Sequence, residues 1–392
     1  GSAFDDGRMT IHHSLYAHNR LRNARTTAGG RVPPVLDFRN NVVYDAKEAT
    51  SHTGSERVFA NWVGNYYKDG PSTGIEGNGV EVSKTIFAFH SKQAHRLFLS
   101  GNVVEGSEER TADNWKAVAW GRKGKKLVSM EEVRVDAASP APFVTTHAAR
   151  EAYDIVLDEA GATLPSRDAI DLRVVRDVRN GTGAVINTET DIPERGRWQT
   201  YHSLKALPDA DGDGMPDFWE KQFGFDADPM ADDDGDGYTN IEEYVNNTDP
   251  RGGAGPIVFV AATVSRGYLG GEAAEIAFYR TGDLAAPLTV RHTGGSVTIA
   301  KGEKSARLSI AAALAGEQTV ELVAGEGYKI GCPSRAMVVI EEGNAPRPVR
   351  LKDLDPTGGA TAADNAEAAR VNEAHKPVKE AKEAERKRKL KN

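Results

Sequence analysis

The chain has 392 residues, 39% of them hydrophobic, which is enough for packed cores and too long for one ordinary domain. Its formal net charge of −8 argues against nucleic acid as the main partner. A lone cysteine, Cys332, excludes a disulfide within this sequence, and no apolar run of about 18 residues is present that could span a membrane.

The N-terminal third contains a repeated pattern. Asn41, Asn65 and Asn102 each precede two β-forming residues, in RNNVVYD, VGNYYKDG and SGNVVEG, at intervals of 24 and 37 residues. Such intervals suit the coils of a large parallel β-solenoid, the longer one including a loop. Asparagine tolerates the left-handed backbone of a coil corner, and its amide can stack in a hydrogen-bonded ladder. We therefore predict a parallel β-helix, the alternative being three ordinary antiparallel strands.

Before these repeats, MTIHHSLYAHNRLRNAR (Met9–Arg25) begins as a strand and ends with Arg20, Arg22 and Arg25. In an acidic chain such a cluster is either a surface charge patch or a binding site for anions. The histidine pair in the strand is expected to pack or form hydrogen bonds within the coil. Later, AREAYDIVLDEAGAT and SRDAIDLRVVRDVRNGTG predict two short helices, which we expect to close the open end of the solenoid.

These segments together resemble one enzyme family. TIHHSLYAHNRLRNAR, VLDFRNNVVYD, ANWVGNYYKDGPST and LPSRDAIDLRVVRDVRNGTGAVI are similar to the pectate lyases of polysaccharide lyase family one. The resemblance implies an all-β fold whose first domain, residues 1–206, is a right-handed parallel β-helix with a C-terminal cap. The helix is expected to be partial, with further coils upstream. Ala24 stands where the family usually has proline.

The resemblance also implies a reaction, which is the cleavage of polygalacturonate by β-elimination with Ca²⁺ assistance. The position that matches the family's catalytic base is Arg22. Residues expected to contact uronate carboxylates are Arg20, Arg25, His18 and Arg31. The aspartates that hold the substrate-bridging calcium in this family lie on earlier coils, and Asp5 and Asp6 do not match them. The activity of this chain alone is therefore open. The alternative is a noncatalytic extracellular polysaccharide-binding or adhesion protein.

An acidic module follows at residues 207–251. DADGDGMPDFWE and DDDGDGYTNIEE place oxygen-bearing side chains at positions 1, 3, 5, 9 and 12, with glycine at position 6, as in EF-hand calcium loops. The predicted Ca²⁺ ligands are Asp209, Asp211, Asp213, Met215, Asp217, Glu220, Asp232, Asp234, Asp236, Tyr238, Asn240 and Glu243, with Met215 and Tyr238 contributing backbone carbonyls. Two full matches 23 residues apart favour calcium loops over a solvated acidic linker. The module is similar to thrombospondin type-3-like and dockerin-like repeats, and its mid-chain position favours a stiff spacer over a dockerin.

Residues 255–342 alternate between apolar and polar residues, which predicts a small β-sandwich. YRTGDLAAPLTV and GYKIGCPSRAMVVIEE resemble a Calx-beta domain. Residues 343–392 lack an apolar face, which predicts a disordered charged tail. Calcium modules together with a polysaccharide partner favour a secreted or cell-surface monomer, although no signal peptide is visible.

Overall fold

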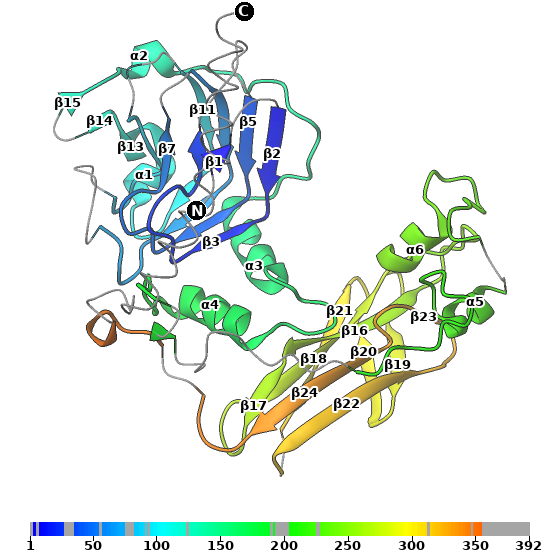
Figure 1. Cartoon of the computed structure of the whole chain (residues 1–392). Coiled ribbons are helices and arrows are strands. Elements are labelled where there is room, and N and C mark those ends of the chain that lie inside the picture. Colours follow the sequence, from blue (N-terminus) through cyan, green and yellow to red (C-terminus); the bar gives the residue numbers. More distant parts are fainter. Residues whose placement is uncertain are drawn as a thin grey trace, which may run out of the picture.

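The computed structural model describes residues 3–4, 8–26, 35–54, 57–74, 82–90, 92, 95–122, 125–188, 191–192, 204–224, 228–311, 314–345 and 348–354. Strands dominate these residues and helices are few, as the composition predicts. The blue-to-cyan part of the chain forms a stack of coils, and the strands coloured yellow-green to orange form a second group (Figure 1). None of the described helices has the length and apolar content needed to cross a bilayer.

The stack of coils consists of three parallel sheets, and the chain visits them in turn. Sheet A contains β1 (Ala3–Phe4), β4 (Arg25–Thr26), β7 (Ser51–Thr53), β10 (Phe87–Ala88) and β13 (Val118–Ala119). Sheet B contains β2 (Arg8–His12), β5 (Val35–Arg39), β8 (Phe59–Val63) and β11 (Arg96–Ser100). Sheet C contains β3 (Leu15–Ala17), β6 (Val42–Tyr44), β9 (Tyr66–Lys68) and β12 (Val103–Val104). All these pairings are parallel, so the solenoid prediction is confirmed and the antiparallel alternative is wrong.

A ladder of buried asparagines joins the coils at the turn between sheets B and C. The side-chain Oδ1 of Asn41 accepts a hydrogen bond from the Ser14 amide at 3.0 Å. In the same way Asn65, Asn102 and Asn114 each accept from the backbone amide of the preceding rung at 2.9 Å. The predicted ladder is therefore confirmed, and Asn114 extends it. Each rung satisfies a backbone donor that the corner would otherwise leave buried without a partner.

The sharp corner itself lies one residue before Ser14, Asn41, Asn65 and Asn102, whereas Asp113, which precedes Asn114, is extended with φ −129°. His13, Asn40, Gly64 and Gly101 have φ values of 48°, 52°, 61° and 65°. The prediction that the ladder asparagines adopt the left-handed backbone is therefore wrong. The ladder residue uses its amide to join the coils, and the residue before it turns the chain.

Aromatic and aliphatic side chains fill the solenoid interior. Phe38 and Trp62, from neighbouring strands of sheet B, stack with ring centroids 4.8 Å apart and are fully buried. The Trp62 Nε1–H donates to the Tyr67 hydroxyl at 2.9 Å, so its polar atom is satisfied. Burial of each such ring contributes about 1.5–3 kcal/mol to stability.

The remaining elements of this part of the chain are short, apart from two helices. They are α1 (Glu108–Ala112), η1 (Asn114–Ala117), β14 (Gly121–Arg122), β15 (Lys125–Lys126), α2 (Met130–Val133), α3 (Ala149–Glu159) and α4 (Ala169–Asn180). The Asp168 side chain caps the start of α4, and Gly181, at φ 67°, ends it.

Both helices predicted after Arg150 are confirmed, but their position differs from the prediction. Residues of α3 and α4, among them Val156 and Val178, form one apolar cluster with Tyr44 and Tyr66 of sheet C. The alternate residues of those strands, such as Val43, belong to the interior cluster. The helices therefore cover the outer face of sheet C rather than the open end of the solenoid.

The second group of strands forms two sheets with one shared core. Its elements are β16 (Ile257–Val264), β17 (Arg266–Tyr268), β18 (Ala274–Arg280), β19 (Leu288–His292), β20 (Gly295–Ile299), β21 (Ser305–Ile310), β22 (Gly316–Val323), β23 (Lys329–Ile330) and β24 (Arg335–Glu341). The sheet orders are β21-β18-β16-β23 and β17-β24-β22-β19-β20. Val258 and Phe278 of the first sheet share an apolar cluster with Val290 and Val338 of the second. The predicted disordered tail begins at residue 343, but its first part includes the buried Val349 and the short η3 (Leu351–Asp353). From residue 355 onward the tail lies outside the described residues.

The two helices of the acidic module pack against the edge of the first of these sheets. In α5 (Asp217–Phe223), the Gln222 side chain donates to the Ile330 carbonyl at 2.9 Å and accepts from the Ile330 amide at 2.7 Å. Directly after α6 (Asn240–Asn246), the Asn247 side chain exchanges the same two bonds with the backbone of Cys332. Two amide side chains thus occupy the place of a neighbouring strand beside β23.

Candidate functional site

The loop that carries Arg20, Arg22 and Arg25, here called the arginine loop, is held by the next coil. The Asn23 amide donates to the Thr50 carbonyl at 3.2 Å, and its side chain donates to the Ala49 carbonyl at 2.9 Å. Ala24 is fully buried, and its carbonyl accepts from the His52 amide at 3.0 Å. A small side chain fits this buried position, at which the resemblance implies a proline.

Arg22 and Arg20 have different surroundings. Arg22 is exposed in the left-handed conformation, with φ 67°, and makes no hydrogen bond or ion pair with the described residues. Arg20 forms an ion pair with Glu48 of the next coil. The guanidinium of Arg22 is therefore available to an incoming group, whereas that of Arg20 already meets a carboxylate. This difference favours Arg22 over Arg20 for contact with an anion.

Arg25 begins a row of polar residues on sheet A. It lies in β4 directly beside His52 of β7, and the His52 ring stacks on that of His90 with centroids 4.6 Å apart. The Nε atom of Arg25 is buried without a hydrogen-bond partner in the described part of the chain. Arg25, His52 and His90 come from three successive coils of the solenoid.

His18 lies inside the structure. Its side chain is only 10% exposed, with Nδ1 2.8 Å from Asp45 and Nε2 3.6 Å from Asp177 of α4. Burial by itself would lower the pKa of His18, but hydrogen bonds and charges from Asp177 and Asp45 outweigh it and raise that pKa. This histidine joins the solenoid to α4, a position that favours a structural role over the predicted substrate contact. Arg31, also predicted to contact substrate, lies outside the described residues.

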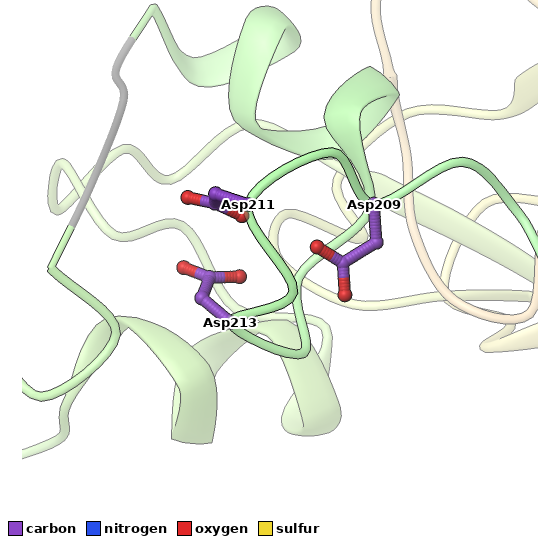
Figure 2. A group of neighbouring side chains, drawn as sticks. All are labelled: Asp209, Asp211 and Asp213. Carbon is purple, nitrogen blue, oxygen red and sulfur yellow. The ribbon is translucent and has the colours of Figure 1, made fainter.

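The first aspartate loop gathers its carboxylates as predicted. One oxygen from each of Asp209, Asp211 and Asp213 lies within 4.8 Å of the others (Figure 2). Asp209 accepts from the amides of Gly212 at 2.8 Å and Gly214 at 3.1 Å, so the loop folds around its first residue. Three carboxylates in one small space repel one another unless a cation neutralises them.

The second aspartate loop repeats this geometry. Oxygens of Asp232, Asp234 and Asp236 form an equivalent cluster, and Asp232 again accepts from two glycine amides, at 2.7 and 3.1 Å. Glu243, at position 12, is 2% exposed, and its Oε2 has no hydrogen-bond partner among the described residues. Burial, followed by the charges of Asp234 and Asp236, raises the pKa of Glu243 to about 7. The Glu243 oxygen without a partner, close enough to feel the Asp234 and Asp236 carboxylates, fits the binding of a hard cation.

The other predicted ligands lie on the same loops. Asn240, at position 9 of the second loop, is fully buried, and its Oδ1 has no partner in the described structure, so this oxygen is available to a cation. Asp217, at position 9 of the first loop, accepts a hydrogen bond from the Ala210 amide at 2.7 Å. Glu220 is buried on α5 and Met215 is fully buried. Tyr238 has a half-exposed side chain, which leaves only its carbonyl for the predicted role.

Sequence reasoning missed the partners that hold the arginine loop and His18. Glu48 and Asp45 follow Arg20 and His18 by 28 and 27 residues, roughly one coil, so the coil period was the available signal. Asp177 gives no such signal, because it comes from a helix that packs against the outside of sheet C.

Comparison with known proteins supports a relationship to pectate lyases. The chain is 29% identical over 254 residues to a protein named probable pectate lyase C from Neosartorya fischeri, covering 62% of this chain and 54% of that protein. Proteins of the same name from Aspergillus fumigatus (over 255 residues) and Emericella nidulans (over 253) are each 28% identical, again covering 54% of their length. The chain thus spans about half the length of the relatives it matches. No family model matches it.

Proposed function

We propose that this chain carries part of the site of a polysaccharide lyase that cleaves polygalacturonate by β-elimination, with Arg22 as the base. The proposal rests on Arg22, which lies in the loop before β4, is exposed and makes no hydrogen bond or ion pair with the described residues. The solenoid that carries it is similar to proteins named pectate lyase. Arg25 would bind a uronate carboxylate through its planar guanidinium. Arg20 and the undescribed Arg31 are further candidates for such contacts.

In the proposed reaction, Arg22 removes the proton on C5 of a galacturonate unit. The electron pair of the C5–H bond becomes a C4–C5 double bond while the bond from C4 to the next sugar breaks, and the leaving oxygen takes up a proton. Arginine normally stays protonated, so this role requires an electropositive setting. Arg25 on the adjoining strand supplies one such charge.

Calcium in this reaction would neutralise the uronate carboxylate and so make the C5 proton more acidic. Within the described residues, the groups of three carboxylates close enough to hold a calcium ion are those of the two aspartate loops, and neither group lies on the solenoid. We therefore assign no side chain of the solenoid to a substrate-bridging ion. The proposal for this chain is limited to the base and to the cations that bind carboxylates.

The aspartate loops are proposed to bind one Ca²⁺ each. The matched carboxylate clusters and the orphaned oxygens of Asn240 and Glu243 support this assignment. We further propose that residues 207–251 form a calcium-stiffened spacer between a solenoid domain at 1–206 and a Calx-beta-like sandwich at 255–342. An extracellular setting would suit both the polysaccharide and the millimolar calcium that such loops often need.

The test is a matched pair of lysine variants in protein that contains this chain and degrades polygalacturonate in the presence of calcium. Arg22→Lys keeps the positive charge but loses the planar fork, and is expected to lower kcat at least 1,000-fold while substrate binding is retained. Arg20→Lys, at a position already paired with Glu48, is expected to change kcat less than tenfold. The measurement is the ultraviolet absorbance of unsaturated products.

Two results would contradict the assignment. Full activity in Arg22→Lys with loss in Arg20→Lys would transfer the catalytic role to Arg20. Saturated products would exclude β-elimination altogether. Binding of polygalacturonate without any cleavage would support the alternative, a noncatalytic polysaccharide-binding protein. The described coils carry no group of three carboxylates that could hold calcium, and this observation favours that alternative.

A further inference from the structure

We propose that His12 and His13 form a binding site for a divalent transition metal such as Zn²⁺ on the outside of the solenoid, with His147 orienting the His13 ring. The proposal does not depend on the arginine loop, because these residues lie at the corner between sheets B and C, where the first coil turns.

Three imidazole rings lie in a row at this corner. Nδ1 of His12 is 3.0 Å from Nδ1 of His13, and Nε2 of His13 is 2.9 Å from Nδ1 of His147. Both ring pairs meet edge to face, with interplanar angles of 84°. A tetrahedral zinc ion with bonds of about 2.0–2.1 Å needs two nitrogens roughly 3.3 Å apart, close to the separation of the two Nδ1 atoms.

The coil corner explains why neighbouring residues converge. Successive side chains of a strand point to opposite faces, which would separate His12 from His13. The left-handed backbone of His13 breaks this alternation at the end of β2. The equivalent corners are occupied by Asn40, Gly64 and Gly101, none of which carries an imidazole.

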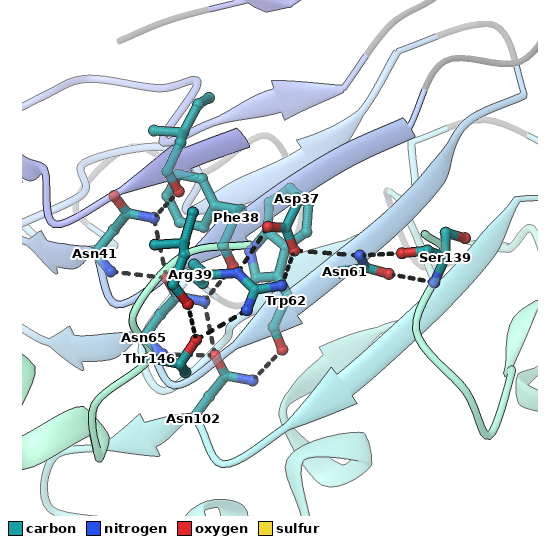
Figure 3. Close-up of polar contacts among 12 residues, drawn as sticks. Asp37, Phe38, Arg39, Asn41, Asn61, Trp62, Asn65, Asn102, Ser139 and Thr146 are labelled. Atoms are coloured by element: carbon teal, nitrogen blue, oxygen red, sulfur yellow. Dashed lines mark hydrogen bonds and ion pairs between the residues drawn. The ribbon is translucent and has the colours of Figure 1, made fainter. Parts of the chain in front are cut away.

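His147 reaches the corner from a distant segment of the chain, which hydrogen bonds fix to the solenoid. Its amide donates to the Asn40 Oδ1 at 2.8 Å, and its carbonyl accepts from the Asn40 Nδ2 at 2.8 Å. The same segment binds sheet B through Asn61 with Ser139 and through Arg39 with Thr146, as Figure 3 shows beside the asparagine ladder. A fixed His147 would hold the second nitrogen of the His13 ring, as partners of metal-ligating histidines do.

The chemistry of the three rings suits a nitrogen-preferring ion. Imidazole nitrogen is a good ligand for Zn²⁺, Cu²⁺ and Ni²⁺, and two such nitrogens meet at this corner. His12 is exposed, which leaves the remaining coordination positions to water. Calcium prefers the oxygen ligands of the aspartate loops, so the two kinds of site select different ions.

The experiment is calorimetric titration of the full chain with Zn²⁺ in excess calcium, which occupies the aspartate loops. The informative variant is His13→Asn, since asparagine tolerates the left-handed corner, as Asn40 shows, but offers no ring nitrogen. His13→Asn and His12→Gln are each expected to weaken Zn²⁺ binding at least tenfold, and His147→Gln by roughly tenfold. His292→Gln, in the second group of strands, is the control and should leave the affinity unchanged.

Electron paramagnetic resonance of bound Cu²⁺ adds a direct readout. The Cu²⁺ signal is expected to show hyperfine splitting from two ring nitrogens in the wild type and from one in His13→Asn. No zinc binding in the wild type, or unchanged affinity in both His12→Gln and His13→Asn, would overturn the proposal. Should His13→Asn fail to fold, the exposed His12→Gln decides alone.

Discussion

The arginine loop and the aspartate loops both present charged side chains, but they obtain their shape differently. Each aspartate loop folds on itself, with Asp209 and Asp232 accepting from glycine amides three and five residues later. The arginine loop depends on another coil, through bonds from Asn23 to residues 26 and 27 positions further along the chain. A site of the first kind is specified locally, whereas one of the second kind exists only when the coils stack.

Calcium removal should give the largest loss of stability, and this loss should be confined to the aspartate loops. A ligand at about 1,000 times its dissociation constant stabilises the folded form by about 4 kcal/mol, so chelation should open these loops. Hydrogen exchange of the full chain is expected to show lost protection over residues 209–249 and unchanged protection in sheets A, B and C. Asp211→Ala and Asp234→Ala should each reduce the calcium stoichiometry from two to one.

Identical exchange with calcium and with chelator would contradict the calcium assignment. Loss of protection in the solenoid as well would show that the stacked coils also depend on calcium, and would contradict the view that the aspartate loops fold independently of them.

Asn65→Ala tests the stacking of the coils, on which the shape of the arginine loop depends. Asn65 accepts from the Asn41 amide and donates to the Phe38 carbonyl at 2.9 Å, so alanine leaves buried polar groups without partners. We expect a loss of about 3 kcal/mol in the unfolding free energy of the solenoid. Calcium affinity should be unchanged. Chemical denaturation followed by tryptophan fluorescence measures the unfolding free energy, and calorimetry measures the calcium affinity. The matched control for stability is Asn246→Ala, at an exposed position on α6.

A smaller, pH-dependent effect is expected at His18, which joins the solenoid to α4. Its pKa is raised in the folded chain above the ordinary 6.5, because Asp177 and Asp45 outweigh the burial. Folding therefore binds a proton, and this stability is fully present below about pH 6.5 and is lost as pH rises through the folded pKa. His18→Gln should remove this part of the pH dependence. The neighbouring groups, Arg173 and Tyr44, remain in that variant.

Denaturation midpoints measured across this pH range provide the test. Equal pH profiles for the wild type and His18→Gln would show that the histidine is not charged between its two carboxylates.

The sequence predicted local features well and distant ones in part. Aspartate spacing identified both carboxylate clusters, because every contact within them is local. The Asn41–Asn65–Asn102 repeat predicted the stacked coils, because each coil reproduces the same hydrogen bond. The side chains that pair with Arg20 and His18 could not be predicted from local spacing. Glu48 comes from the next coil and Asp177 from a helix whose place on sheet C depends on apolar packing.

The pairing of Gln222 and Asn247 with the backbone beside β23 has a consequence for solubility. An edge strand offers free amides and carbonyls on which another chain can add its own strand. Here two side chains of the acidic module occupy those groups at Ile330 and Cys332. If the module opens without its cation, the edge becomes a template for aggregation, so calcium supply would help to keep this chain from polymerising.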